Sequence, residues 1–167
     1  MEYAGKQYDF RDKDAAYEEL ARDLRALLAE ESDLIANAAN TAALIFSALP
    51  DINWTGFYFS RGSELVVGPF QGKPACVRIA IGRGVCGTAA AQRKAIIVPD
   101  VHAFPGHIAC DAASRSEIVI PLMVVERVIG VLDIDSFRLE RFDEADLRGL
   151  TRLGEIFCSS TRFDLGE

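Results

Sequence analysis

The spacing of apolar residues changes twice along the chain, and this change constrains the fold more than any other feature. In residues 14–28, and again after Asp143, apolar side chains recur every three or four positions, as in amphipathic helices. Between these segments, β-branched and aromatic residues form short runs separated by turn residues, as in strands. Helices at both ends and strands between them predict an α+β fold with a mostly antiparallel central sheet.

The boundaries of these elements follow from caps, turns and prolines. Four helices are predicted. The first covers residues 14–28, and the second starts after an N-cap at Ser32 and ends before Pro50. The third covers residues 85–92, and the fourth opens at Phe142. The predicted strands cover residues 52–59, 64–67, 76–81, 95–98, 117–124 and 128–134. Residues 101–115 form a long irregular stretch, which favours a functional role over a simple connection.

Composition limits the classes of function. The chain has 167 residues, half of them hydrophobic, which is enough for one domain with a core. Its net charge of −7 argues against nucleic acid and against an anionic membrane surface as partners. The first residues contain no apolar signal region, and the apolar run 118–125 is too short to span a bilayer. We therefore expect a soluble cytoplasmic protein, in which thiols are kept reduced.

Three cysteines, Cys76, Cys86 and Cys110, lie beside glycine, proline or other small residues, which places them on loops or at the ends of elements. A zinc site would combine them with His102 or His107, but there is no Cys-x-x-Cys pair, so we predict no metal. The spacing is compatible with two other interpretations. The protein could be a thiol redox enzyme with one attacking and one resolving cysteine, or the three thiols could be inert.

Among these cysteines, Cys110 is the better candidate nucleophile by position. It shares its loop with both histidines, and a histidine or Arg115 could supply the positive charge that favours a thiolate. The fourth cysteine, Cys158, lies within the apolar run of the last helix, as a structural cysteine does.

Acidic residues cluster at the ends of two predicted strands. Asp133 and Asp135 alternate along one strand, so their side chains share a face, and Glu117 begins the neighbouring strand. Carboxylates that lie close together must be solvated, paired or turned toward a cationic ligand. Taken alone, the pattern favours solvated strand ends.

Aromatic residues crowd the first strand. If that strand is regular, Trp54 and Tyr58 share one face while Phe57 and Phe59 take the other. Both rows could belong to the core, or Trp54 and Tyr58 could form the wall of a pocket.

Together, these segments resemble the free methionine-(R)-sulfoxide reductases, which are single GAF domains. The resemblance runs from about Tyr17 to the C-terminal helix. It is carried by residues 53–58 (NWTGFY), 65–72 (LVVGPFQG), 82–87 (GRGVCG), 107–111 (HIACD), 114–117 (SRSE) and 131–136 (VLDIDS). Sensory GAF domains lack the three cysteines, so the pattern is specific. It implies a GAF-like fold, with one domain over residues 1–167 and a core at 14–163.

The resemblance also implies a role for each cysteine. Cys110 matches the cysteine that attacks the sulfoxide, Cys76 matches the resolving cysteine that forms a disulfide with it, and Cys86 matches a third that binds substrate or resolves in its place. The matching substrate-binding residues are the acids and aromatics noted above: Glu117, Asp133, Asp135, Trp54 and Tyr58.

The implied substrate is free methionine-(R)-sulfoxide, the implied reductant is thioredoxin, and no cofactor is required. A non-catalytic GAF module that binds a small ligand, or a redox sensor, is the alternative. The sequence leaves the oligomeric state open, with a homodimer as one option.

Overall fold

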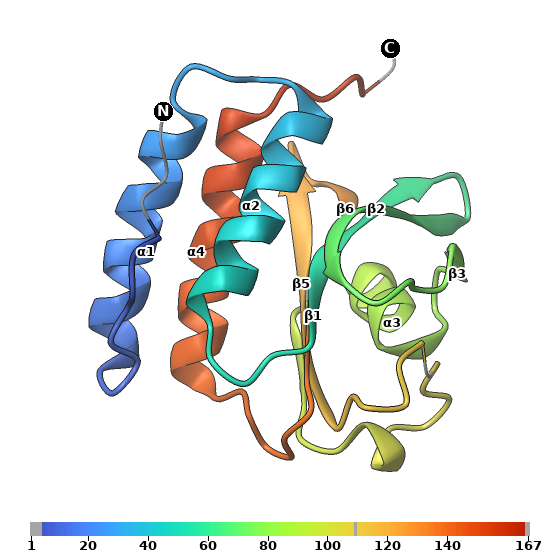
Figure 1. The fold of residues 1–167 in the computed structure, drawn as a ribbon. Coiled ribbons are helices and arrows are strands. Elements are labelled where there is room, and N and C mark those ends of the chain that lie inside the picture. Colours follow the sequence, from blue (N-terminus) through green and yellow to red (C-terminus); the bar gives the residue numbers. More distant parts are fainter. Residues whose placement is uncertain (1–4, 109, 166–167) are drawn as a thin grey trace.

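The computed structural model of the protein describes residues 5–108 and 110–165. The helices are α1 (Lys13–Leu28), α2 (Leu34–Ala48), α3 (Gly84–Gln92) and α4 (Glu144–Ser160), with a short 3₁₀ helix η1 (Val101–Ala103). The strands are β1 (Trp54–Arg61), β2 (Glu64–Gly72), β3 (Arg78–Ala80), β4 (Ile96–Val98), β5 (Ser116–Val124) and β6 (Arg127–Ser136). In this part of the chain, α-helices α2, α3 and α4 pack against a six-stranded sheet and α1 packs against α4 and α2, which confirms the α+β class (Figure 1).

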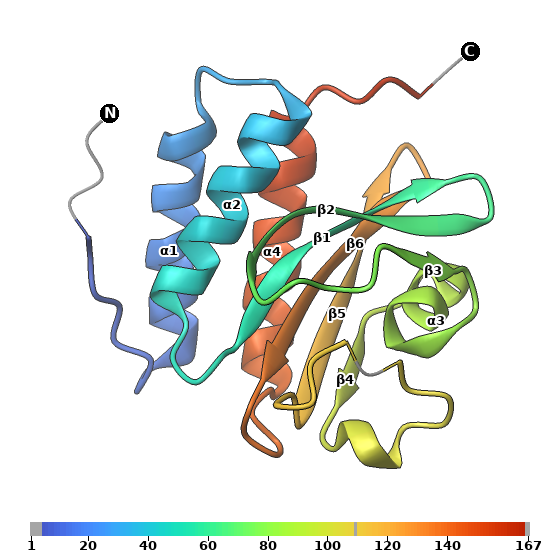
Figure 2. The ribbon, with the colours of Figure 1, turned by 45° about the vertical axis from the view of Figure 1, so that its right-hand side comes forward.

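The strands lie in the order β3-β2-β1-β6-β5-β4, and each neighbouring pair is antiparallel. Helices α1, α2 and α4 lie on one side of the sheet, while α3 and the segments around it lie on the other (Figure 2). None of the helices in the described residues is both long and apolar enough to cross a membrane.

The two faces of the sheet belong to two separate apolar clusters. Phe57 and Phe59 point from β1 into the cluster shared with α1, α2 and α4, whereas Trp54 and Tyr58 point into the cluster that contains α3. This division confirms the predicted alternation along β1, because successive side chains of a strand point to opposite faces.

Several predicted boundaries were wrong: β1, for example, runs over Trp54–Arg61 and not over residues 52–59. Helix α2 is capped by Asp33, whose carboxylate accepts a hydrogen bond from the Ala36 amide, and not by Ser32. Cys76 lies outside β3, because β3 pairs with β2 through residues 78–80 alone. β2 extends to Gly72 through Pro69. Pro69 lies at an irregularity in the pairing of β1 with β2 and beyond the residues that pair with β3, a place where a strand tolerates a proline.

Helix α1 is joined to α4 by a buried polar cluster around Asp146, which is fully buried. Its carboxylate accepts a hydrogen bond from the Tyr17 hydroxyl (2.8 Å) and forms ion pairs with Lys13 Nζ (2.6 Å) and Arg141 Nη1 (3.2 Å). It also accepts a bond from the Asp143 amide, which completes the capping box of α4. One carboxylate therefore satisfies donors from two segments of the chain, α1 and the stretch that leads into α4.

We predict that Asp146→Ala lowers the free energy of unfolding by about 3–5 kcal/mol, because it leaves buried donors without their acceptor. Urea denaturation monitored by circular dichroism measures this change. Glu144→Gln is the matched control, since Glu144 is an exposed acid in the first turn of the same helix and should change stability by less than about 0.5 kcal/mol. Equal effects of the two substitutions would contradict the role given to Asp146.

Candidate active site

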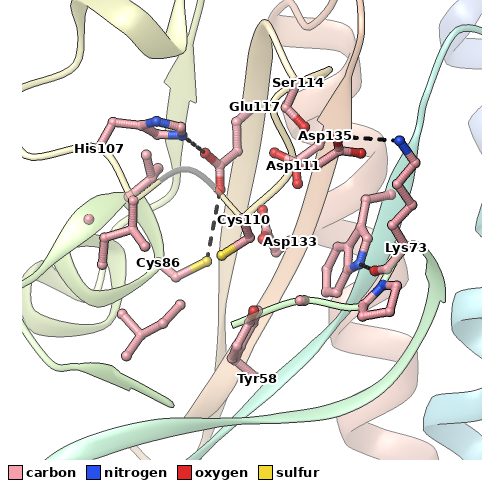
Figure 3. A pocket seen from close by; sticks show the side chains of 17 residues that line it. Tyr58, Lys73, Cys86, His107, Cys110, Asp111, Ser114, Glu117, Asp133 and Asp135 are labelled. Atoms are coloured by element: carbon pink, nitrogen blue, oxygen red, sulfur yellow. Dashed lines mark hydrogen bonds and ion pairs between the residues drawn. The ribbon is translucent and has the colours of Figure 1, made fainter. Parts of the chain in front are cut away.

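A cavity of about 40 Å³ lies beneath α3, on the face of the sheet away from the other helices (Figure 3). Seven of the eight residues predicted for the site line it: Trp54, Tyr58, Cys86, Cys110, Glu117, Asp133 and Asp135. The eighth, Cys76, joins the site through its bond to Cys110. The fold thus brings together residues from strands β1, β5 and β6, from α3 and from two loops.

Cys76 and Cys110 form a disulfide. They are 34 residues apart in sequence, with 5.7 Å between their Cα atoms. Cys76 lies in the segment between β2 and β3 and is partly buried, whereas Cys110 lies in the loop before β5 and is exposed. The pairing is the one that the family resemblance implied, and it shows that the two thiols can reach each other.

Cys86 occupies the first turn of α3 and is buried. Its Sγ lies 3.9 Å from Oε1 of Glu117. Burial raises the pKa of the Cys86 thiol, and the neighbouring carboxylates, Asp133 first among them, raise it further. Cys86 is therefore a poor nucleophile in this environment.

The glycines on either side of Cys86 have a steric role. Gly84 begins α3 with a positive φ of 58°, and a side chain there would touch Ile108 of the cysteine loop. A side chain at Gly87 would overlap the carbonyl oxygen of Ala80. These two positions let α3 approach both β3 and the loop closely, which positions Cys86 at the cavity.

The interpretation of the acids as solvated strand ends is wrong for Glu117 and Asp133, which are buried, while Asp135 is partly buried. Glu117 and Asp133 are only 5% and 6% exposed, and Glu117 pairs directly with Asp135 across strands β5 and β6. Burial, followed by the charge of Asp135, raises the pKa of Glu117 to about 8. Burial and the neighbouring carboxylates also raise the pKa values of Asp133 and Asp135. A cationic group of a ligand would relieve this repulsion.

The aromatic residues of β1 hold the segment that carries Cys76. Trp54 Nε1 donates a hydrogen bond to the carbonyl oxygen of Lys73 (3.1 Å), and the Tyr58 hydroxyl donates one to the carbonyl oxygen of Cys76 (3.0 Å). The two rings stack with their centroids 5.9 Å apart. They therefore form a wall of the cavity and also fix the backbone next to the disulfide.

His107 and Lys73 also line the cavity, although the sequence named His107 only as a possible metal ligand or source of positive charge and gave Lys73 no role. His107 Nε2 lies 3.6 Å from Oε2 of Glu117, and Lys73 Nζ lies 3.9 Å from Oδ1 of Asp111. Each precedes a site cysteine by three residues, which is the signal that could have identified them. Arg115, expected to favour a Cys110 thiolate, is not among the lining residues.

Comparisons with known proteins agree with this site. A family profile described as GAF domain matches residues 28–157. The chain is 57% identical to the free methionine-R-sulfoxide reductase of Escherichia coli over 137 residues, covering 82% of this chain and 83% of that protein. It is 42% identical to the Saccharomyces cerevisiae protein of the same name over 159 residues, covering 90% and 88%. The X-ray structure of the Neisseria meningitidis enzyme in complex with its substrate superposes with a TM-score of 0.88 at 46% identity, covering 92% of each chain.

Proposed function

The chain belongs to the GAF domain family and, within it, to the free methionine-R-sulfoxide reductases, and we propose that it reduces free L-methionine-(R)-sulfoxide to L-methionine. The observation that carries this proposal is the Cys76–Cys110 disulfide beside a cavity whose lining includes the acids Glu117, Asp133 and Asp135. Such a site combines a nucleophile, a resolving thiol and groups that can bind a cation or give up a proton. The preference for the R configuration at sulfur rests on the names of the relatives.

The first chemical step is attack of the Cys110 sulfur on the sulfur of the substrate. The bond that forms between the two sulfurs breaks again as the sulfoxide oxygen leaves the substrate and becomes the hydroxyl of a sulfenic acid on Cys110. The substrate sulfur is thereby reduced by two electrons to that of methionine, and the Cys110 sulfur is oxidised by two. The departing oxygen is partly negative, so a neighbouring carboxyl group assists by protonation. We take Glu117 and Asp133 as the candidates for this role, which is supported by their lining the same cavity as Cys110.

The second step consumes the sulfenic acid. The thiol of Cys76 attacks the Cys110 sulfur, water leaves, and the disulfide seen in the structure forms. Thioredoxin, as an external dithiol, then exchanges with this disulfide and returns both cysteines to thiols. Because this cycle needs a reducing thiol pool, we also propose that the protein works in the cytoplasm.

The buried acids give restriction to the free amino acid a physical basis. A free amino acid carries an ammonium group, and a residue inside a peptide does not. Among the residues that line the described cavity, the acids Glu117, Asp133 and Asp135 are close neighbours, and the single lysine, Lys73, contacts Asp111 instead. The ammonium group of the substrate can therefore supply the positive charge that would balance these carboxylates.

The extent of the domain and its assembly are further parts of the proposal. We take residues 14–163 as the core of a single GAF domain over residues 1–167, of which 1–4, 109 and 166–167 lie outside the described residues. The cluster around Asp146 supports including α1, which begins before the family match at residue 28. A homodimer stays a prediction, which the molar mass in solution checks.

The function is tested by measuring methionine released from free methionine-R-sulfoxide in the presence of thioredoxin, thioredoxin reductase and NADPH. We expect turnover of the free R form, and little or none of the free S form or of peptide-bound methionine-R-sulfoxide. Absence of turnover with intact thiols would favour a ligand-binding or redox-sensing module instead.

We predict that Glu117→Gln, Asp133→Asn and Asp135→Asn each lower kcat/KM for the free substrate by roughly ten- to a hundredfold. This is the loss of about 1.5–3 kcal/mol expected when a charge-assisted hydrogen bond to the ligand is removed. Steady-state kinetics on each variant measures it. A variant with lower kcat and unchanged KM identifies the group that donates the proton.

The matched control is Glu126→Gln, because Glu126 is an exposed acid in the turn of the same β5–β6 hairpin. It should keep the kcat/KM of the unmodified enzyme. If all three site variants behave like Glu126→Gln, the acids have no part in binding or catalysis.

A further inference from the structure

We propose that Cys86, Glu117 and Asp133 form a binding site for one thiophilic divalent cation such as Zn²⁺, and that this cation excludes the substrate from the pocket. Each of the three residues offers one ligand atom, and these atoms lie within 4.8 Å of one another. All three side chains are buried, and they come from α3, β5 and β6.

The types and spacing of these atoms suit zinc. Zinc binds cysteine sulfur and carboxylate oxygen in a tetrahedron whose neighbouring ligand atoms lie roughly 3.5 Å apart. The Cys86 sulfur and the nearer Glu117 oxygen are 3.9 Å apart, so a small movement would give this spacing. The thiolate favours zinc over magnesium or calcium, which prefer ligand sets made of oxygen alone.

An independent observation points to a missing ligand at the same place. Asp133 is 6% exposed, and its Oδ1 atom is fully buried with no hydrogen-bond partner in the described part of the chain. Buried carboxylate oxygens are nearly always satisfied, so one without a partner calls for an explanation. Because Asp133 lines the cavity beside Glu117 and Cys86, a cation bound there would satisfy this oxygen (Figure 3).

The surroundings fit an ion better than a larger group in this disulfide form. A volume of about 40 Å³ holds an ion with a few waters, since one water needs roughly 10–15 Å³. His107 Nε2 lies 3.6 Å from the other oxygen of Glu117 and can complete the ligand set (Figure 3). Lys73, the single lysine or arginine among the described lining residues, is 74% exposed and contacts Asp111, so it does not neutralise the cluster.

Binding of the cation and binding of the substrate would be mutually exclusive. The carboxylates that hold the metal are those proposed to hold the ammonium group of methionine sulfoxide. This consequence rests on the proposed function, whereas metal binding itself does not. A rise in free zinc would then inhibit the reductase reversibly and competitively with the sulfoxide.

Cobalt(II) is a direct probe, because a cysteine ligand gives it a sulfur-to-metal charge-transfer band in the near ultraviolet. The disulfide form of the protein is titrated with Co²⁺ and then with Zn²⁺. In this form Cys76 and Cys110 are joined, which leaves Cys86 and Cys158 as the free thiols. We expect one Co²⁺ per chain with a charge-transfer band, and displacement of the Co²⁺ by Zn²⁺.

The variants assign the ligands. Cys158→Ser is the matched control and should keep the band, while Cys86→Ser should lose it and bind Zn²⁺ at least roughly tenfold more weakly. Glu117→Gln should keep the sulfur band but also bind at least roughly tenfold more weakly, which provides a second measure if Cys86→Ser folds poorly. No band in the unmodified protein, or a band that survives in Cys86→Ser, overturns the proposal.

Competition is measured without turnover. The Cys76→Ser/Cys110→Ser double variant cannot react but keeps the same two free thiols, so calorimetry can follow its binding of free methionine-R-sulfoxide with and without Zn²⁺. The apparent Kd of the sulfoxide should rise in proportion to Zn²⁺. Simultaneous binding of Zn²⁺ and the sulfoxide would refute the exclusion of substrate. If the sulfoxide does not bind but the Co²⁺ band is normal, the result counts against the proposed function and not against the metal site.

Discussion

Cys110→Ser should abolish the reduction of free methionine-R-sulfoxide, with kcat falling by roughly 10⁴-fold or more. A serine hydroxyl keeps its proton at neutral pH and is a far weaker nucleophile than a thiol toward sulfur. The structure favours Cys110 over the other two site cysteines for this role. Cys110 is exposed and lines the cavity, Cys76 does not line it, and burial raises the pKa of Cys86.

The measurement is methionine released per enzyme, in the first turnover and in steady state. Cys158→Ser is the matched control, because Cys158 lies on α4 and packs against the other apolar cluster, and its substitution should leave kcat unchanged. Circular dichroism of both variants checks that the fold is kept. Substantial first-turnover release by Cys110→Ser would mean that Cys86 or Cys76 is the attacking residue.

Cys76→Ser should release about one methionine per enzyme rapidly, and its steady-state turnover with thioredoxin should fall by roughly a hundredfold or more. The first step needs only Cys110, so the burst survives. Without Cys76 the sulfenic acid on Cys110 is not converted to the disulfide that thioredoxin reduces. A small thiol such as dithiothreitol can reduce the sulfenic acid directly and should restore part of the turnover.

Mass spectrometry of the enzyme after one turnover separates the roles of Cys76 and Cys86. The unmodified protein should contain the Cys76–Cys110 disulfide, as in the structure, and Cys76→Ser should contain a Cys110 adduct with a sulfenic acid reagent. A Cys86–Cys110 disulfide as the main product of the unmodified enzyme would exchange the roles assigned to Cys76 and Cys86.

Features that depend on neighbours in sequence could be predicted well. The period of the apolar residues identified the helices at both ends and the strands between them. Alternation along β1 separated Trp54 and Tyr58 from Phe57 and Phe59, and alternation along β6 placed Asp133 and Asp135 on one face. These predictions hold because a strand turns its side chains to opposite faces whatever it packs against.

Boundaries were less accurate, because they depend on contacts between elements. Cys76 was predicted to begin a strand, but β3 is limited to the residues that pair with β2. Asp33 and Ser32 are both good N-caps by residue type, and the local chain path decides which one meets the free amides of α2.

The order of the elements and the faces of β1 and β6 could be read from the sequence alone, and family resemblance added which residues gather at the site. The folded structure was needed to find that Glu117 and Asp133 are buried, that His107 lies beside Glu117, and that Asp146 joins α1 to α4. The physical reason is that local spacing sets the direction of a side chain, whereas its burial and charge environment are set by segments far away in the chain. The three acids become a site that can bind a cation only when several elements meet, namely strands β5 and β6, helix α3 and the loop of Cys110.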